Sequence, residues 1–227
     1  MFPQNMIQNG GQSPVNETSL LKTGTTCLGL KFDGGVIIAA DKRVSAGWKV
    51  GEADKIFMIT KDSIAMAISG LVSDAMSLVD IMRSELRLYE FENGYPANPT
   101  VSSSLLGAIL HSGFRRFQPF WVGLIVGGFD VRSKKGKLFF IDPSGAVSTD
   151  NYGVIGSGSL FALSKIEDVW KEGMTKEDAK ALAIRAIKLA ASRDLYSGDG
   201  INVFIITSDG VEKDSIDFPK ILDSEEA

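Results

Sequence analysis

The stretch "KTGTTCLGLKFDGGVIIAADKR", residues 22–43, contains two β-rich apolar runs separated by "DGG". A short glycine-containing turn between apolar runs is a strong hairpin signal. We therefore predict that regular structure begins at Thr25 with two antiparallel strands. The Lys-Thr-Gly sequence before Thr25 has three interpretations: the glycine ends a turn, the threonines are simply strand formers, or the Gly24–Thr25 bond breaks and leaves Thr25 as a new N-terminus.

The size and charge of the chain limit what it can be. Its 227 residues are enough for one domain with a well-buried core. The net charge of −4 argues against nucleic-acid binding, which needs a basic face. No apolar run reaches the roughly 18 residues of a membrane span, and the N-terminus has no secretory signal pattern. We therefore expect a cytoplasmic protein with neither nucleic acid nor membrane as a partner.

Two residue counts narrow the possible chemistry. The chain has one cysteine, Cys27, and one histidine, His111. An internal disulfide is excluded and a Cys/His zinc site is disfavoured, so we expect no metal. A Ser-His-Asp triad would need His111, which lies within an amphipathic pattern typical of a helix. The remaining nucleophiles are Cys27 or a hydroxyl activated by a lysine or an amine. An N-terminal threonine carries its own amine, whose unperturbed pKa is about 8, close to working pH.

The hydrophobic pattern predicts a single domain after residue 24. Residues 1–24 are rich in Asn, Gln, Gly, Ser and Pro, and we interpret them as a removable leader or a frayed tail. Strand and helix patterns then alternate. We predict strands at 25–32, 35–42, 55–60, 63–69, 121–130, 137–142, 201–208 and 211–217, and helices at 71–94, 100–117, 159–173 and 175–194. Strand runs joined largely by hairpins and alternating with helix pairs indicate antiparallel sheets covered by helices, an α+β fold.

Five segments taken together, "TGTTCLGLKFDGGVIIAADKRVSAG", "DKIFMI", "MAISGLVSDA", "IGSGS" and "RDLYSGDGINVFII", resemble a proteasome β subunit of archaeal type. The resemblance runs from Thr25 to about Ile216, and it makes residues 25–227 one domain of this type. It implies an N-terminal-nucleophile hydrolase, with a four-layer αββα sandwich of two antiparallel sheets between helix layers. It also implies a zymogen activated by autocatalytic cleavage, without a metal or organic cofactor.

The resemblance assigns roles to residues near the predicted hairpin. Thr25 takes the place of the nucleophile, freed by autolysis after Gly24. Lys55, in "DKIF", matches the lysine that activates the nucleophile, an alignment that rests on the shared Lys-Ile-Phe ending. Asp41 matches the acidic residue beside that lysine, and Arg43 matches the arginine that helps to hold the site. The alternative is that Asp41 and Arg43 form a solvated strand end and that Lys55 is a surface lysine.

Further roles follow from the same resemblance. Ser157, Asp194 and Ser197 match the trio that hydrogen-bonds around the threonine amine, and Gly70 matches the residue whose N–H stabilises the oxyanion. The residues matching the substrate pocket are Val44, Ser45, Ala53, Ile68, Val72 and Met76. None of them is charged, so we expect cleavage after large apolar residues, unless a neighbouring subunit contributes charges to the pocket.

These assignments predict a catalytic β subunit that hydrolyses peptide bonds in unfolded polypeptides through an acyl ester on Thr25. By resemblance, its partners are other β subunits in a seven-membered ring, an α ring and, through the α ring, an ATP-dependent unfoldase. The main alternative is a non-catalytic or unprocessed β subunit with a structural role in the same ring. A bacterial two-ring peptidase of the same superfamily fits less well, because its chains are shorter and lack this leader. A non-enzymatic binding module would leave the Thr25–Lys55–Asp41 set without a reason.

Overall fold

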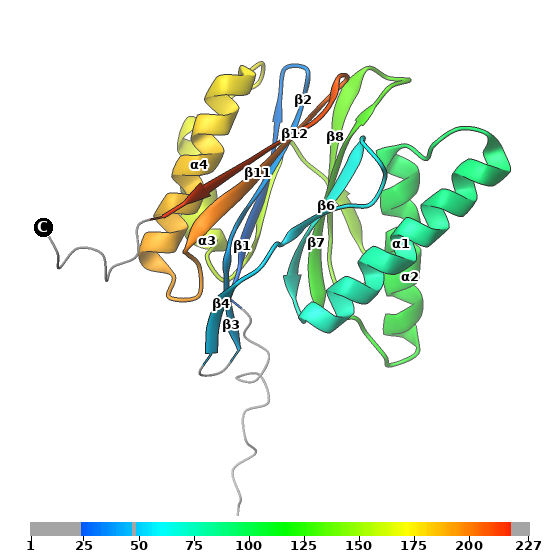
Figure 1. Ribbon diagram of the computed structural model, residues 1–227, viewed down its shortest axis with the longest axis horizontal. Helices are drawn as coiled ribbons and strands as arrows, with labels where there is room; N and C mark the ends of the chain where they lie inside the picture. The colour runs from blue at the N-terminus through cyan, green and yellow to red at the C-terminus, as the bar shows by residue number, and fades with distance from the viewer. Residues whose placement is uncertain (1–23, 47–48, 219–227) are drawn as a thin grey trace, which may run out of the picture.

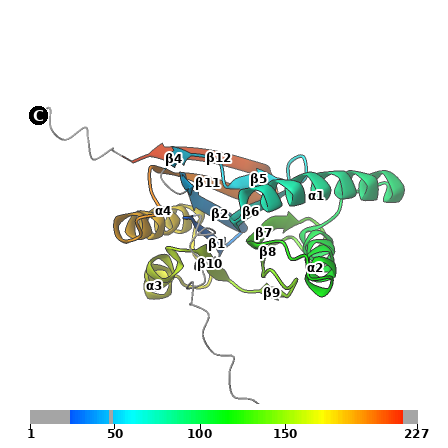
Figure 2. The ribbon, with the colours of Figure 1, turned by 90° about the horizontal axis from the view of Figure 1, so that it is seen from below.

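A computed structural model describes residues 24–46 and 49–218 of the chain. Two antiparallel sheets of five strands each stack against one another, in the orders β10-β1-β2-β11-β12 and β5-β6-β7-β8-β9. Helices α3 and α4 cover the outer face of the first sheet, and α1 and α2 cover the second, as Figures 1 and 2 show. The predicted α+β sandwich of two antiparallel sheets between helix layers is confirmed.

The elements follow one another in the predicted alternation. The first sheet consists of β1 (Thr26–Phe32), β2 (Gly35–Asp41), β10 (Tyr152–Gly156), β11 (Gly200–Thr207) and β12 (Gly210–Asp217). The second consists of β5 (Ile56–Met58), β6 (Ile64–Gly70), β7 (Val122–Asp130), β8 (Lys135–Ile141) and β9 (Val147–Thr149). The helices are α1 (Val72–Asn93), α2 (Pro99–Arg115), α3 (Ser159–Val169) and α4 (Lys176–Arg193). A separate hairpin, β3 (Arg43–Ala46) and β4 (Lys49–Glu52), extends from one end of the sandwich (Figure 1).

The sequence of β2 shows why its strand is apolar throughout. Val36 and Ile38 belong to the core between the two sheets, together with Ile125. Ile37 and Ala39 point the opposite way and pack in the cluster that contains α4. Because both faces of this central strand are buried, it forms a continuous hydrophobic run instead of alternating with polar residues.

Some element boundaries differ from the predicted ones. The β3–β4 hairpin and the short strands β9 and β10 were not predicted. The third helix ends at Val169 and not at residue 173, because Trp170 takes an extended conformation. The second begins at Pro99, capped by the Asn98 side chain, and ends before Phe117, whose φ of 59° is outside the helical region. None of the helices in the described residues is long and apolar enough to cross a membrane.

Candidate functional site

Thr25 lies just before β1, at a point where several strand ends meet. Its neighbour Thr26 pairs with Gly156 at the end of β10, and Cys27 pairs with Ala40 near the end of β2. Asp41, the last residue of β2, pairs with Ile201 at the start of β11. The antiparallel topology therefore brings together side chains that are far apart in the sequence.

Thr25, Lys55 and Asp41 form a connected, buried group. The Lys55 ammonium donates to Asp41 Oδ1 at 2.7 Å, and their side chains are 5% and 0% exposed. The same ammonium donates to the carbonyl oxygen of Gly24 at 3.1 Å, and the Thr25 hydroxyl donates to that oxygen at 2.6 Å. Buried charges are tolerated when they are paired and hydrogen-bonded. Because both side chains are buried, Lys55 is not a surface lysine and Asp41 is not a solvated strand end.

Backbone N–H groups complete the surroundings of the Asp41 carboxylate. Oδ1 also accepts from the Thr26 N–H at 2.7 Å, and Oδ2 accepts from the N–H groups of Gly198 at 2.9 Å and Arg43 at 3.2 Å. Burial raises the pKa of the Asp41 carboxyl above its usual value, while the Lys55 ammonium and the N–H groups of Thr26 and Gly198 act in the opposite direction. Asp41 therefore fixes the position of Lys55 and is itself fixed from three directions.

A second polar network meets the backbone of Thr25 from the other side. The Thr25 N–H donates to Ser157 Oγ at 3.3 Å, and the Ser157 hydroxyl donates to Asp194 Oδ2 at 2.5 Å. The Ser197 hydroxyl donates to the same oxygen of Asp194 at 2.7 Å. The Thr26 hydroxyl is hydrogen-bonded to Ser197 Oγ, also at 2.7 Å. Of the predicted trio, Ser157 contacts the Thr25 nitrogen itself, Asp194 is linked to it through Ser157, and Ser197 is hydrogen-bonded to Asp194 and Thr26.

Gly70 is the last residue of β6 and stands two residues before the start of α1. Its φ is +117°, and a Cβ added there would lie 2.2 Å from the carbonyl oxygen of Trp121. Only glycine fits this position, for both reasons. Gly70 also lines the cavity beside Thr25.

A cavity of about 230 Å³ opens next to Thr25. Its lining consists of Gly24, Thr25, Val44, Ala53, Asp54, Lys55, Phe57, Ile68, Gly70, Val72 and Met76. Five of the six predicted pocket residues are among these. The sixth, Ser45, belongs to β3, where its side chain lies outside the described part of the structure.

Two further lining residues were missed by the sequence analysis. Phe57 stands two residues after Lys55 in an extended segment, and the two-residue period of a strand could have placed both on one face. Asp54 corrects the expectation that no acidic residue lines the pocket. It is exposed, and its carboxylate accepts from the Asn202 side-chain amide at 2.9 Å.

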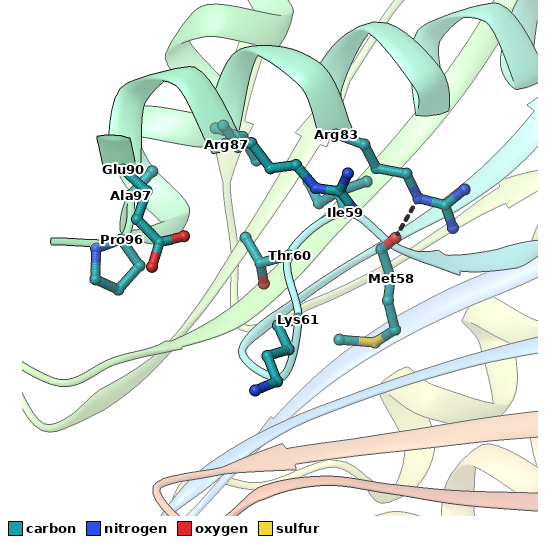
Figure 3. A pocket seen from close by; sticks show the side chains of 10 residues that line it. Met58, Ile59, Thr60, Lys61, Arg83, Arg87, Glu90, Pro96 and Ala97 are labelled. Atoms are coloured by element: carbon teal, nitrogen blue, oxygen red, sulfur yellow. Dashed lines mark hydrogen bonds between the residues drawn. The ribbon is translucent and has the colours of Figure 1, made fainter. Parts of the chain in front are cut away.

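Figure 3 shows a larger cavity, of about 330 Å³, between the β5–β6 hairpin and α1. Arg83 crosses it to donate to the carbonyl oxygen of Met58 at 3.0 Å. Its Thr60 hydroxyl accepts from the Ile64 N–H within the hairpin turn, and Lys61 is exposed. The residues lining this cavity therefore do not include a hydroxyl beside a buried lysine–carboxylate pair, and we assign the candidate site to the cavity at Thr25.

The same site offers little to a metal ion. Nowhere in the described residues do three or more His, Cys, Asp or Glu side chains gather in a way that could hold one. The acidic residues nearest Thr25 are occupied: Asp41 by Lys55 and three N–H groups, and Asp194 by two serine hydroxyls.

The two stacked antiparallel sheets between helix layers make this an α+β sandwich, and its candidate site holds a buried lysine beside a threonine. Residues 21–206 match the family model described as "Proteasome subunit", and the chain belongs to this family. Among its relatives is proteasome subunit beta 2 of Korarchaeum cryptofilum, 41% identical over 82% of this chain and 92% of the relative. Proteasome subunit beta 2 of Aeropyrum pernix is 38% identical over 95% and 98%. Proteasome subunit beta of Methanocaldococcus jannaschii is 40% identical over 90% and 91%. The chain is therefore similar to archaeal proteasome β subunits over nearly its whole length.

Proposed function

We propose that this chain is a catalytic β subunit of a proteasome core particle, a threonine-type endopeptidase that cleaves unfolded polypeptides. One observation carries the proposal. The Gly24 carbonyl oxygen is contacted at once by the Thr25 hydroxyl, at 2.6 Å, and by the Lys55 ammonium, at 3.1 Å. A nucleophile and a cation thus stand at the bond that would be cut to free Thr25.

The first reaction is autolysis of the Gly24–Thr25 bond. The Thr25 Oγ attacks the Gly24 carbonyl carbon, its proton passes through solvent water to the leaving Thr25 nitrogen, and negative charge develops on the carbonyl oxygen. Lys55 stabilises that charge from 3.1 Å, as a fixed cation does in a water-poor site. The C–N bond then breaks, and the Thr25 nitrogen takes a proton and becomes an amine. Water hydrolyses the resulting ester, so that residues 1–24 leave with a new carboxylate.

The second reaction is cleavage of a peptide by the freed Thr25. Its α-amine lies where the network of Ser157, Asp194 and Ser197 meets the Thr25 nitrogen, and it takes the proton of the hydroxyl. Lys55 lowers the pKa of that hydroxyl through its charge. Gly70, at the cavity wall and close to the start of α1, donates its N–H to the oxyanion. An acyl ester on Thr25 forms as the peptide C–N bond breaks and the protonated α-amine passes its proton to the leaving amine, and water then cleaves the ester.

Membership of the family implies assembly with other proteasome subunits. We propose the arrangement expected from the resemblance: a seven-membered β ring, an adjoining α ring and an ATP-dependent unfoldase acting through it, in the cytoplasm. The mostly apolar cavity beside Thr25 takes the side chain before the scissile bond.

Mass spectrometry of the chain from assembled particles tests the proposal. The wild-type chain is expected to begin at Thr25. Thr25→Ala is expected to retain residues 1–24 and to hydrolyse no fluorogenic peptide, while Thr25→Ser, which keeps a hydroxyl, retains part of both activities. A wild-type chain that still carries residues 1–24 in the particle would instead support the unprocessed structural subunit. Near-normal peptide cleavage by Thr25→Ala would reject Thr25 as the nucleophile.

A further inference from the structure

An arginine–aspartate pair joins β3 to the turn before β11. Arg43 Nε donates to Asp199 Oδ2 at 3.0 Å, and its Nη2 donates to Oδ1 at 2.8 Å. The pair is bidentate, the geometry in which guanidinium and carboxylate groups bind most specifically. Its side chains are only 27% and 17% exposed. The third guanidinium nitrogen, Nη1, donates to the carbonyl oxygen of Leu195 at 3.0 Å.

The guanidinium lies against the backbone that it holds. A Cβ added to Gly198 would lie 2.6 Å from Arg43 Nη2 and 2.7 Å from its Cζ, so the side chain packs directly on this glycine. The Arg43 N–H also donates to the carbonyl oxygen of Gly198, at 3.1 Å. Gly198 in turn donates its own N–H to Asp41 at 2.9 Å. The pair therefore fixes the peptide group that completes the surroundings of the Asp41 carboxylate.

The same turn carries the second polar network. Asp194 and Ser197 lie in it, and they reach Thr25 and Thr26 through their hydrogen bonds. Residues 194–199 are thus the segment that connects the Lys55–Asp41 group with the group around the Thr25 nitrogen. Arg43 is the only charged side chain of β3, among the described residues, that hydrogen-bonds to this turn; its partners are Asp199 and the carbonyl oxygen of Leu195.

The backbone of Asp199 limits what can stand there. Its φ is +64°, in the left-handed region that favours glycine, asparagine and aspartate. Of these three residues, only aspartate carries the charge that a guanidinium binds in bidentate fashion. Aspartate therefore meets both requirements of this position: a left-handed backbone and a carboxylate that pairs with Arg43.

We propose that Asp199 is a positioning residue for the proposed peptidase reaction, acting through Arg43 to hold residues 194–199 in register with Asp41. This inference rests on the proposed function of the Thr25 site. Asp199 does not touch the reacting atoms. It holds the Lys55–Asp41 pair, on one side of Thr25, in a fixed position relative to Asp194 and Ser197, on the other. Both leader removal and peptide cleavage depend on this arrangement.

Two substitutions that tolerate the left-handed backbone test this role. Asp199→Asn removes the charge and nearly preserves the shape, and Asp199→Gly removes the side chain. In assembled particles we expect kcat for a fluorogenic peptide to fall about 10-fold for Asp199→Asn and up to about 100-fold for Asp199→Gly, because small displacements of catalytic groups can cost that much. KM should change less than about threefold, and leader removal should slow in parallel.

Asp217→Asn is the matched control. Asp217 pairs with Lys42, the residue beside Arg43, but its side chain is 80% exposed. We expect its kcat and KM to stay within about twofold of the wild type. If Asp199→Gly keeps the kcat of Asp217→Asn, or loses activity only through KM or through fewer assembled particles, the positioning role is wrong.

Hydrogen exchange separates this inference from the proposed function. It is measured on residues 194–200 in a Thr25→Ala background, where no catalysis is needed. Asp199→Gly should exchange the Gly198 amide at least about 10-fold faster than Asp217→Asn does. Unchanged exchange would overturn the inference whatever the activity of the particle. Peptidase activity that survives Thr25→Ala would overturn the proposed function, while the exchange result still decides whether Asp199 holds the turn.

Discussion

Replacing Lys55 with alanine tests the centre of the proposed mechanism. The change removes the cation that lies 3.1 Å from the Gly24 carbonyl oxygen. It also leaves the Asp41 carboxylate, which is 0% exposed, with its N–H donors but without the ammonium at 2.7 Å. The structure therefore predicts two separate effects, one on stability and one on catalysis.

The effect on stability follows from an unpaired buried charge. Removing one partner of a buried ion pair costs about 3–5 kcal/mol. For a chain of this size, 1 kcal/mol corresponds to about 2–4 °C, so the melting temperature should fall by roughly 6–20 °C.

The loss of stability should depend on pH. Burial already raises the pKa of Asp41, and losing Lys55 removes the largest influence that lowers it. The folded pKa then exceeds the unfolded one further, so the penalty applies in full above the folded pKa and shrinks as Asp41 takes up a proton. The difference in melting temperature between wild type and Lys55→Ala should narrow as the pH is lowered.

The effect on catalysis is larger than stability alone explains. Loss of one group that stabilises developing negative charge, as Lys55 does beside the Thr25 hydroxyl, typically costs about 10²–10³ in kcat. We expect a fall of this size in the hydrolysis of a fluorogenic peptide by assembled particles, and a comparable slowing of leader removal followed by intact mass. Lys55→Arg should not restore either rate. Its guanidinium keeps the charge but is larger and planar, so it does not fit the buried space between Asp41 and the Gly24 carbonyl oxygen.

A double variant separates the two effects. Lys55→Ala combined with Asp41→Asn leaves no unpaired charge, so part of the lost stability should return; the rest is lost because an amide offers one acceptor oxygen where the carboxylate accepts from N–H groups at both oxygens. Activity should stay low, because the cation is still missing. If Lys55→Ala retains more than about a tenth of the wild-type kcat, or if the double variant regains activity together with stability, the reasoning about Lys55 is refuted.

Three further predictions concern the leader, the cysteine and the pocket. Gly24→Ala should slow leader removal strongly in a mass-spectrometric time course, because its Cβ would lie 1.8 Å from the Tyr196 Cβ; the processed fraction should cleave peptides normally, and rapid processing would contradict the packing. Burial raises the pKa of the Cys27 thiol to about 12, so a thiol reagent at pH 8 should modify it only after unfolding, and fast labelling of native particles would argue against this. Peptides ending in Tyr or Leu should be cleaved at least about 10-fold faster than those ending in Glu, because burying an unpaired charge in the mostly apolar cavity costs several kcal/mol and Asp54 repels an acidic side chain. Equal rates for Tyr and Glu would reject the apolar pocket.

The fold could be predicted because its strongest signals are local. The continuous apolar run of β2 and its "DGG" turn indicate a buried hairpin, and helical spacing of apolar residues indicates α1 and α4. Thr175 illustrates how short the range of such signals is: its hydroxyl accepts from the Asp178 N–H, as a helix cap three residues away should. The β3–β4 hairpin was missed because its residues neither alternate clearly nor form an apolar run.

The candidate site could be predicted only in part, for a physical reason. The roles of Lys55 and Asp194 could be predicted because their side chains are part of sequence motifs that resemble those of proteasome β subunits. The role of the Gly198 N–H could not be predicted from the sequence, because every residue except proline has an N–H group. Only the path of the folded chain brings this one to Asp41. Asp199 was overlooked for a similar reason: its partner Arg43 is 156 residues away in the sequence, and a surface aspartate looks the same as a clamping one.

The two proposed reactions share their chemistry but not their source of selectivity. In autolysis the acyl group is that of Gly24, which has no side chain to place in the cavity. Position alone selects this bond: Gly24 is packed against Tyr196, and its carbonyl oxygen is held by Thr25 and Lys55. A peptide substrate has no such tether, so it must gain binding energy from the cavity lined by residues such as Met76. Changes in the cavity should therefore alter which peptides are cleaved while leaving leader removal nearly unaffected, whereas changes at Lys55 must affect both, because both reactions place negative charge beside it.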